Sequence, residues 1–320
     1  MRRRLFSSIL TILAACLLIS CASRNDVCET CIERTDERLM DAAAELYPGA
    51  VQRLLDEGAD INAKDQYGET PLMKALRQPA SRSLESMRPM ETTIRDLLDA
   101  GADIRVVNTR GTDTLKLAQE TGNLEVIKLF DRHMTPAERD QMFMRTLADR
   151  QYDLALYLLG SGASPAQVNE KNQSALHLAV NSSEPVPELV NALLKSNDVN
   201  LADNYGTTPV MTACANGAPV GIVKLLLENG SQINSRYHQK NLLYLALMAE
   251  KENIGLLKYL LTSGFSANEV APNGQPFIVL MAKADRIRSA KALADAGAEL
   301  SVLDKYGESA YRSRLNILAV

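Results

Sequence analysis

Cys28 and Cys31 have the most reactive spacing in the chain, because two residues separate their thiols. Such a pair can act as a redox disulfide or supply two ligands to zinc. Redox pairs stand at the start of a helix in a β-α-β setting, which the surrounding sequence does not provide. Zinc needs four ligands, and no second pair follows nearby. We therefore expect either a small disulfide loop or two thiols without a catalytic role.

The histidines offer no metal site. His133, His177 and His238 are far apart, and none has a partner at the spacing of metal ligands. Met142 and Met144 could offer sulfur to copper. The chain has eleven methionines, however, and such residues more simply fill gaps between helices. The sequence predicts no bound metal.

Asp65, Asp203 and Asp304 are carboxylates that could serve acid–base chemistry. They lie far apart in the sequence, and each opens a short Gly-containing turn that its own side chain can cap. The chain also lacks the nucleophile elbow, the phosphate-binding loop and the dinucleotide fingerprint. We predict that the protein is not an enzyme and needs no cofactor.

The first twenty residues have the make-up of a secretory leader. Three arginines at 2–4 precede an apolar run over 5–19, which is too short to span a bilayer core of about 30 Å comfortably. The run ends in Leu-Ile-Ser before Cys21, a pattern that resembles the lipobox of bacterial lipoproteins. Leu-Ala-Ala before Cys16 is a second match, but cleavage there would leave apolar residues behind the lipid. We prefer Cys21; an uncleaved membrane anchor is the alternative.

This resemblance implies a signal peptide over 1–20, an acylated Cys21 as the mature N-terminus and a polar tether over 21–35. In that family, Ala22 rather than Asp after the cysteine favours the outer membrane. The expected location is therefore the periplasmic side of a bacterial outer membrane. Each buried CH₂ of an acyl chain contributes about 0.8 kcal/mol, so two or three chains would hold the protein there durably.

The remainder of the chain is periodic. Apolar segments ending in a Leu-Leu pair are followed by turns rich in Gly, Ala, Asp and Asn. These turns begin at Gly58, Gly101, Gly162, Ser196, Gly230, Gly264 and Gly297. From Gly162 onward the intervals are 34 residues three times and then 33. A fixed period of this size is typical of stacked structural repeats.

A second signal follows the turns. It reads Asp65-Gln-Tyr-Gly-Glu-Thr-Pro-Leu, Asp203-Asn-Tyr-Gly-Thr-Thr-Pro-Val and Asp304-Lys-Tyr-Gly-Glu-Ser-Ala. Together with the period, it resembles ankyrin repeats over residues 36–320. The resemblance implies an all-α solenoid of about eight helix-turn-helix units plus a C-terminal half unit, in which each unit is stabilised by its neighbours.

Local rules support this interpretation. Thr70 and Thr208 each precede a proline, which predicts a hydroxyl N-cap followed by Pro at the first helical position. Gly58, Gly101 and Gly230 stand where a left-handed C-cap is needed. Small residues should keep the first helices thin, at Ala75, Ala118, Ala179 and Ala246. By family resemblance, His177 should bond the backbone of the neighbouring unit, and we expect Cys214 to be a buried helix residue.

The predicted units cover 36–64, 65–107, 108–133, 134–168, 169–202, 203–236, 237–270 and 271–303, with the half unit over 304–320. The unit over 65–107 carries an insertion, 79–90, between its helices. This insertion, with Arg82 and Arg88, either grips a partner or is a tolerated surface loop. The unit over 134–168 is degenerate and lacks the full Thr-Pro-Leu-His head.

The composition and net charge limit the classes of ligand that the protein can bind. The chain has 320 residues, is 46% hydrophobic and 23% charged, and lacks Trp, which is typical of a globular protein built from small side chains. Its net charge is −4 with the three leader arginines included. An acidic body argues against nucleic acid or anionic lipid as the main ligand.

The resemblance implies protein binding through the turn tips and the exposed side of the first helices, a concave face. Tyr and Arg are enriched among residues that dominate binding energy. The candidate partner-binding residues are Tyr67, Tyr205, Tyr306, Arg110, Lys171, His238, Lys305, Arg77, Gln78, Asn181 and Asn216. The alternative for the tyrosines is packing on the adjacent turn.

The expected function is that of a monomeric, membrane-anchored periplasmic protein that binds a protein partner stoichiometrically. Envelope ankyrin lipoproteins include immunity proteins that neutralise a toxin, such as a phospholipase effector of a type VI secretion system. The alternative is an envelope scaffold that holds a periplasmic enzyme or an assembly partner.

Overall fold

The computed structural model describes residues 29–78, 84–234 and 240–310. Within these ranges the chain forms sixteen α-helices and, apart from four isolated β-bridges, no strand. The predicted all-α solenoid of paired helices is confirmed. Among these helices none has the length and apolarity needed to cross a bilayer. The leader and the expected roles of Cys16, Cys21, Cys28, Arg82 and His238 fall outside the described residues.

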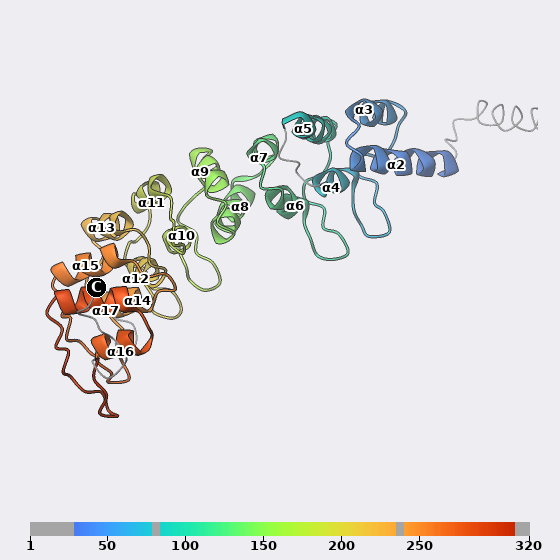
Figure 1. Cartoon of the computed structure of the whole chain (residues 1–320). Helices are drawn as coiled ribbons and strands as arrows, with labels where there is room; N and C mark the ends of the chain where they lie inside the picture. The colour runs from blue at the N-terminus through green and yellow to red at the C-terminus, as the bar shows by residue number, and fades with distance from the viewer. Residues whose placement is uncertain (1–28, 79–83, 235–239, 311–320) are drawn as a thin grey trace, which may run out of the picture. The chain divides into compact units, whose positions relative to one another are not determined.

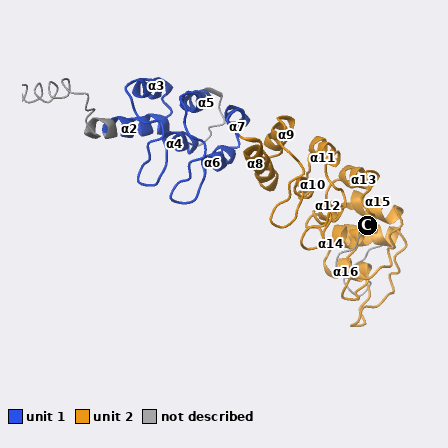
Figure 2. Ribbon diagram, turned by 180° about the vertical axis from the view of Figure 1, so that it is seen from behind, with its two compact units in different colours: residues 1–134 blue, residues 135–320 orange. Residues whose placement is uncertain are grey.

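The chain divides into two compact units, residues 1–134 and 135–320 (Figure 2). The division falls at the predicted start of the degenerate repeat, where Thr135 caps the first helix of unit 2 and a proline follows it. We describe each unit by itself.

Unit 1 has two helical layers (Figure 1). Its helices are α2 (Glu29–Ala44), α3 (Pro48–Asp56), α4 (Pro71–Leu76), α5 (Leu84–Asp99), α6 (Thr114–Glu120) and α7 (Leu124–Asp131). The first helices α2, α4 and α6 pack in sequence on one another, and α3, α5 and α7 form the second layer. α2 begins inside the segment assigned to the tether.

Unit 2 continues the same alternation. Its helices are α8 (Pro136–Ala148), α9 (Tyr152–Gly160), α10 (Ala175–Ala179), α11 (Pro187–Leu194), α12 (Pro209–Ala215), α13 (Val220–Glu228), α14 (Leu242–Met248), α15 (Ile254–Thr262), α16 (Phe277–Lys283) and α17 (Ile287–Asp295). Each even-numbered helix pairs with the odd-numbered helix that follows it.

Small side chains allow the layers to stack closely. The four alanines predicted to thin the first helices are at most 2% exposed. Cys214 is fully buried in α12, as predicted, and burial raises the pKa of its thiol to about 12. Because thiolates rather than thiols react, Cys214 serves packing. Met142 also fills the core, whereas Met144 is half-exposed.

Two local predictions need correction. Thr70 caps α4, since its Oγ1 accepts from the backbone N–H of Met73 at 3.4 Å, but Thr208 does not cap α12. The Thr208 hydroxyl is buried without a hydrogen-bond partner. Part of the segment predicted to lie between helices is also helical, because α5 begins at Leu84. Met90 and Ile94, four residues apart, are buried and extend the apolar face of α5 toward its N-terminus.

Other local predictions are confirmed. Gly58 and Gly230 end their helices with φ of +92° and +94°. His177 is fully buried, and its Nε2 lies 2.9 Å from the carbonyl oxygen of Thr207 in the next repeat. Its Nδ1 accepts from the backbone N–H of Ser174 at 3.2 Å, so Nε2 carries the proton and donates.

Candidate protein-binding surface

Short turns connect consecutive helix pairs, and we call them hairpin tips. The described tips cover 65–69 and 108–112 in unit 1, and 169–173, 203–207, 271–275 and 304–308 in unit 2. Asp65 Oδ1 accepts from the backbone N–H of Tyr67 at 2.8 Å and of Glu69 at 2.9 Å. Asp203 and Asp304 make the corresponding bonds within their own tips. The predicted capping role of these three carboxylates is confirmed.

Because the aspartates fix the tips, the tyrosines that follow them project outward. Tyr67, Tyr205 and Tyr306 are 47%, 61% and 73% exposed. The guanidinium carbon of Arg110 lies 5.8 Å from the centre of the Tyr67 ring. The ammonium group of Lys305 lies 5.0 Å from the Tyr306 ring. Two of the three rings therefore carry a cation over them and remain open to solvent.

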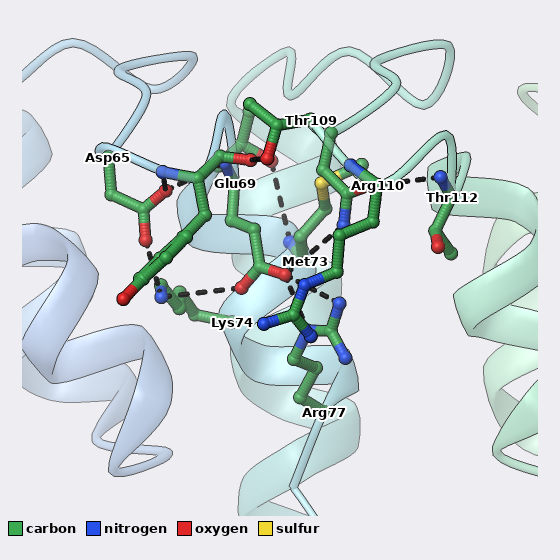
Figure 3. Close-up of polar contacts among 11 residues, drawn as sticks. Asp65, Glu69, Met73, Lys74, Arg77, Thr109, Arg110 and Thr112 are labelled. Carbon is green, nitrogen blue, oxygen red and sulfur yellow. Dashed lines mark hydrogen bonds and ion pairs between the residues drawn. The ribbon is translucent and has the colours of Figure 1, made fainter.

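In unit 1 a buried carboxylate organises the surrounding charges (Figure 3). Glu69 is 5% exposed. Its Oε1 accepts from Arg77 Nε at 2.7 Å and from Asn108 Nδ2 at 3.2 Å, while Oε2 lies 3.3 Å from Lys74 Nζ. Lys74 also pairs with Asp65 Oδ2 at 2.6 Å. This group of five side chains joins α4 to two successive hairpin tips.

The ion pairs keep the group charged. Burial raises the pKa of Glu69, but the bonds from Arg77 and Lys74 outweigh burial and leave that pKa below its ordinary value. The bond to Asp65 raises the pKa of Lys74. Burial raises the pKa of Asp65 as well, but the bonds from Lys74 and from the backbone outweigh it, so Asp65, Glu69 and Lys74 are all charged near neutral pH.

Hydrogen bonds also tie the two tips of unit 1 together. The backbone N–H and the hydroxyl of Thr109 both donate to the carbonyl oxygen of Tyr67, at 2.9 and 3.0 Å. Asn108 Oδ1 accepts from the backbone N–H of Arg110 at 3.0 Å and of Thr112 at 2.9 Å. The positions from which Tyr67 and Arg110 project are thus fixed by backbone bonds.

Unit 2 has an open groove beside its first described tip. It has a volume of about 620 Å³ and lies between α8 and residues 167–171. Met144 and Val168 supply apolar surface, and Arg145 and Lys171 are among its cations. Asn204 donates to the carbonyl oxygen of Lys171 at 2.9 Å, which ties this tip to the following one. The predicted candidate Lys171 therefore borders a hollow that the sequence did not indicate.

At the far end of unit 2, Lys283 of α16 lies between two carboxylates. Its Nζ is 2.6 Å from Asp304 Oδ2 and 2.5 Å from Glu308 Oε2, and it also lies 5.6 Å from the Tyr306 ring. The bond from Lys283 and then the backbone N–H of Glu308 lower the pKa of Asp304 to about 2, from an ordinary value of 3.8. The tip over 304–308 thus depends on an ionised Asp304.

Acid should therefore loosen this tip. The unfolded chain takes up a proton on Asp304 at a higher pH than the folded chain, so the stabilisation is complete above about pH 4 and is lost as the pH falls toward about 2. Asp304→Asn should remove this part of the pH dependence while keeping the shape. Hydrogen exchange of the Tyr306 and Glu308 amides at several pH values would test it. Equal acid sensitivity in both proteins would contradict the assignment.

Some predicted contact residues have mainly structural partners. Asn216 Nδ2 donates to Asn181 Oδ1 at 3.1 Å and to the carbonyl oxygen of Thr212 at 2.9 Å. Arg77 is the C-cap of α4 and donates to Glu69, and Gln78 directly follows it. Sequence reasoning missed Glu69, Lys74 and Lys283. The available signal for Glu69 was an acidic residue just before the Thr-Pro head, with Lys74 and Arg77 downstream.

Within the described ranges, no group of three or more His, Cys, Asp or Glu side chains is placed to hold a metal ion. Residues 142–237 match the family model described as "Ankyrin repeats (3 copies)". This part of the chain therefore carries ankyrin repeats, which are typical of protein–protein interaction modules.

Curated relatives show the same similarity. The chain is 29% identical over 246 residues to the E3 ubiquitin-protein ligase KEG of Arabidopsis thaliana, covering 70% of this chain and 14% of KEG. It is 25% identical over 283 residues to the ankyrin repeat and KH domain-containing protein mask-1 of Caenorhabditis elegans, covering 73% of this chain and 11% of that protein. A putative ankyrin repeat protein of Fowlpox virus, FPV244, is 26% identical over 143 residues, which cover 43% of this chain and 20% of FPV244. The chain thus spans a small part of the length of these relatives.

Proposed function

We propose that this protein is a lipid-anchored, periplasmic module that acts by binding a protein partner stoichiometrically. One observation carries the binding role: one described hairpin tip of unit 1 and two of unit 2 have an aspartate that caps the tip's own backbone and, two residues later, an exposed tyrosine. Exposed, rigidly held aromatic and Arg side chains are the kind of group that dominates protein binding energy. The ankyrin repeats support the same role.

The anchor and the biological task rest on the sequence. Arginines at 2–4, the apolar run over 5–19 and Cys21 support lipid attachment at the periplasmic side of the bacterial outer membrane. A lipid anchor would station an inhibitor at the membrane that a lipid-degrading toxin attacks. The proposed task is therefore immunity against an effector such as a phospholipase delivered by a type VI secretion system.

Binding can be tested by capture. The full chain, tagged and solubilised from membranes, should retain a protein partner from envelope extracts. Changing Tyr67, Tyr205 and Tyr306 to Ala should reduce that capture by about tenfold or more if the rings are central to the interface. Tyr47→Ala is the matched control, because Tyr47 is 61% exposed but lies between α2 and α3 rather than at a hairpin tip. Unchanged capture by the triple variant would remove the tyrosines from the interface.

Immunity can be tested in cells. Deletion of the gene should make cells sensitive to siblings that deliver the matching toxin, and a version with Cys21→Ser should protect less because the anchor is lost. A deletion that weakens the envelope in the absence of any toxin would favour a scaffold instead. Detection of the chain in the cytoplasm alone would contradict the proposed location.

A further inference from the structure

Beside the group around Glu69 lies one cation that has no carboxylate partner among the residues that the structure describes. Two carboxylates, Asp65 and Glu69, face three cations, Lys74, Arg77 and Arg110. Lys74 pairs with both carboxylates, and Arg77 pairs with Glu69. Arg110 contacts the face of the Tyr67 ring instead. Together with Arg110, the group therefore carries one net positive charge.

The charge is placed where a partner can reach it. Arg110 is exposed, and the side chain of Arg77 is 36% exposed even though it bonds Glu69. Figure 3 shows the Arg110 side chain extending from its tip toward the end of α4 that carries Arg77. The Tyr67 ring beneath Arg110 adds an exposed face.

The two tips and the Arg77 side chain need little further ordering before a partner binds. Thr109 joins the two tips through two bonds to the Tyr67 carbonyl oxygen, and Glu69 holds the Arg77 fork with bonds from both Nε and a terminal nitrogen. Groups that are already ordered lose less conformational entropy when a partner binds. An arginine fork also favours planar, two-oxygen acceptors such as a carboxylate.

We propose that Arg110, Arg77 and Tyr67 receive a carboxylate side chain from an acidic loop of the protein partner. This inference rests on the proposed binding function and adds the chemistry of the partner. A membrane surface fits less well, because polybasic attraction to anionic lipid uses clusters of about four to eight Lys and Arg residues. Here the excess is one charge, on a chain whose net charge is −4.

A defined probe can test the receptor. Arginine side chains of the full chain, labelled with ¹⁵N, would be titrated with hexaglutamate and, separately, with hexaglutamine. Hexaglutamate should shift the Nε–H signals of Arg110 and Arg77 saturably, and hexaglutamine should not. Arg110→Gln should weaken hexaglutamate binding by about tenfold or more, and Arg110→Lys should weaken it less, since charge remains without the fork. Arg132→Gln, at an arginine of unit 1 whose side chain is 53% exposed and which is not a candidate binding residue, is the matched control and should leave binding unchanged.

Several results would contradict the proposed carboxylate receptor. One is that the Arg110 and Arg77 signals shift equally with hexaglutamate and hexaglutamine. Another is that the signal of the exposed Arg132, which already pairs with Asp99, shifts as much as theirs. A third is a shift of Arg110 by phosphatidylglycerol vesicles but not by hexaglutamate, which would identify lipid as the occupant. Arg110→Gln should not unfold the chain, because the described structure shows only the ring contact for that side chain; its thermal midpoint would verify this.

The same variant separates this inference from the binding role. If a captured partner is retained equally by Arg110→Gln and by the double variant with Arg77→Gln, the receptor is wrong while the binding function stands. If hexaglutamate binds at Arg110 but no envelope protein is captured, the binding function fails and the carboxylate receptor is supported. If less partner is captured by the variant, and less also by the parent when salt is added, the carboxylate receptor and the binding function are both supported. Salt should have this effect because the screening length of exposed charges is only about 3 Å at 1 M salt.

Discussion

Replacing His177 by alanine should lower the free energy of unfolding of unit 2 by about 3 kcal/mol. The imidazole is fully buried, so its removal leaves a cavity in the α10 region. It also removes the Nε2–H donor from the Thr207 carbonyl oxygen, 2.9 Å away, and leaves that oxygen without this bond. Since repeats are stabilised mainly by their neighbours, loss of a bond between two repeats should weaken the stack locally. Urea unfolding followed by circular dichroism would measure the change.

The control is His177→Gln, which keeps a buried hydrogen-bond donor and should cost less than alanine. The dependence of stability on acidic pH gives an independent measurement. Burial lowers the pKa of His177 despite its bond to Thr207, so the folded state prefers the neutral ring. The unfolded state gains a proton first as the pH falls below about 6.5, and the stabilisation therefore declines on the acid side of that value. An alanine variant as stable as the parent, with the same pH dependence, would show that the histidine is not a structural link.

Glu69→Ala should lower the free energy of unfolding of unit 1 by about 2 kcal/mol. Removing one member of a buried ion pair costs about 3–5 kcal/mol, and the value is smaller here because Lys74 and Arg77 retain access to water. The change leaves Asn108 Nδ2 and Arg77 without their carboxylate partner. Thermal unfolding followed by circular dichroism would measure the change.

A matched control is available in the same unit. Arg132 and Asp99 lie 2.7 Å apart, but both side chains are 53% exposed. Asp99→Ala should therefore change the free energy of unfolding by less than about 1 kcal/mol. If Glu69→Ala and Asp99→Ala had the same small effect, Glu69 would not be the organising carboxylate of the cluster.

Interactions within a few residues were predictable from the sequence. The capping bonds of Asp65, Asp203 and Asp304 join groups two to four residues apart, and the residue types report them directly. The end of α3 at Gly58 follows from the same kind of rule. Even here the rule can fail, because Thr208 has the right type and position for a cap and yet its hydroxyl makes no hydrogen bond within the described structure.

Contacts between repeats were not predictable in this way. Arg110 was predicted as a contact residue, but its place over Tyr67 depends on how two tips 40 or more residues apart stack. Glu69 likewise meets Asn108 across two tips. The groove beside Lys171 depends on where α8 lies, in a repeat that lacks the usual head. The repeat pattern of the sequence specifies none of these distances.

By itself, then, the sequence determined the all-α repeat and the phase of its turns, because both follow from local backbone geometry or from the period of apolar residues. Only the tertiary structure decided which charges meet and which cation is left without a carboxylate. That outcome depends on stacking between repeats, which brings together side chains that no short-range rule relates.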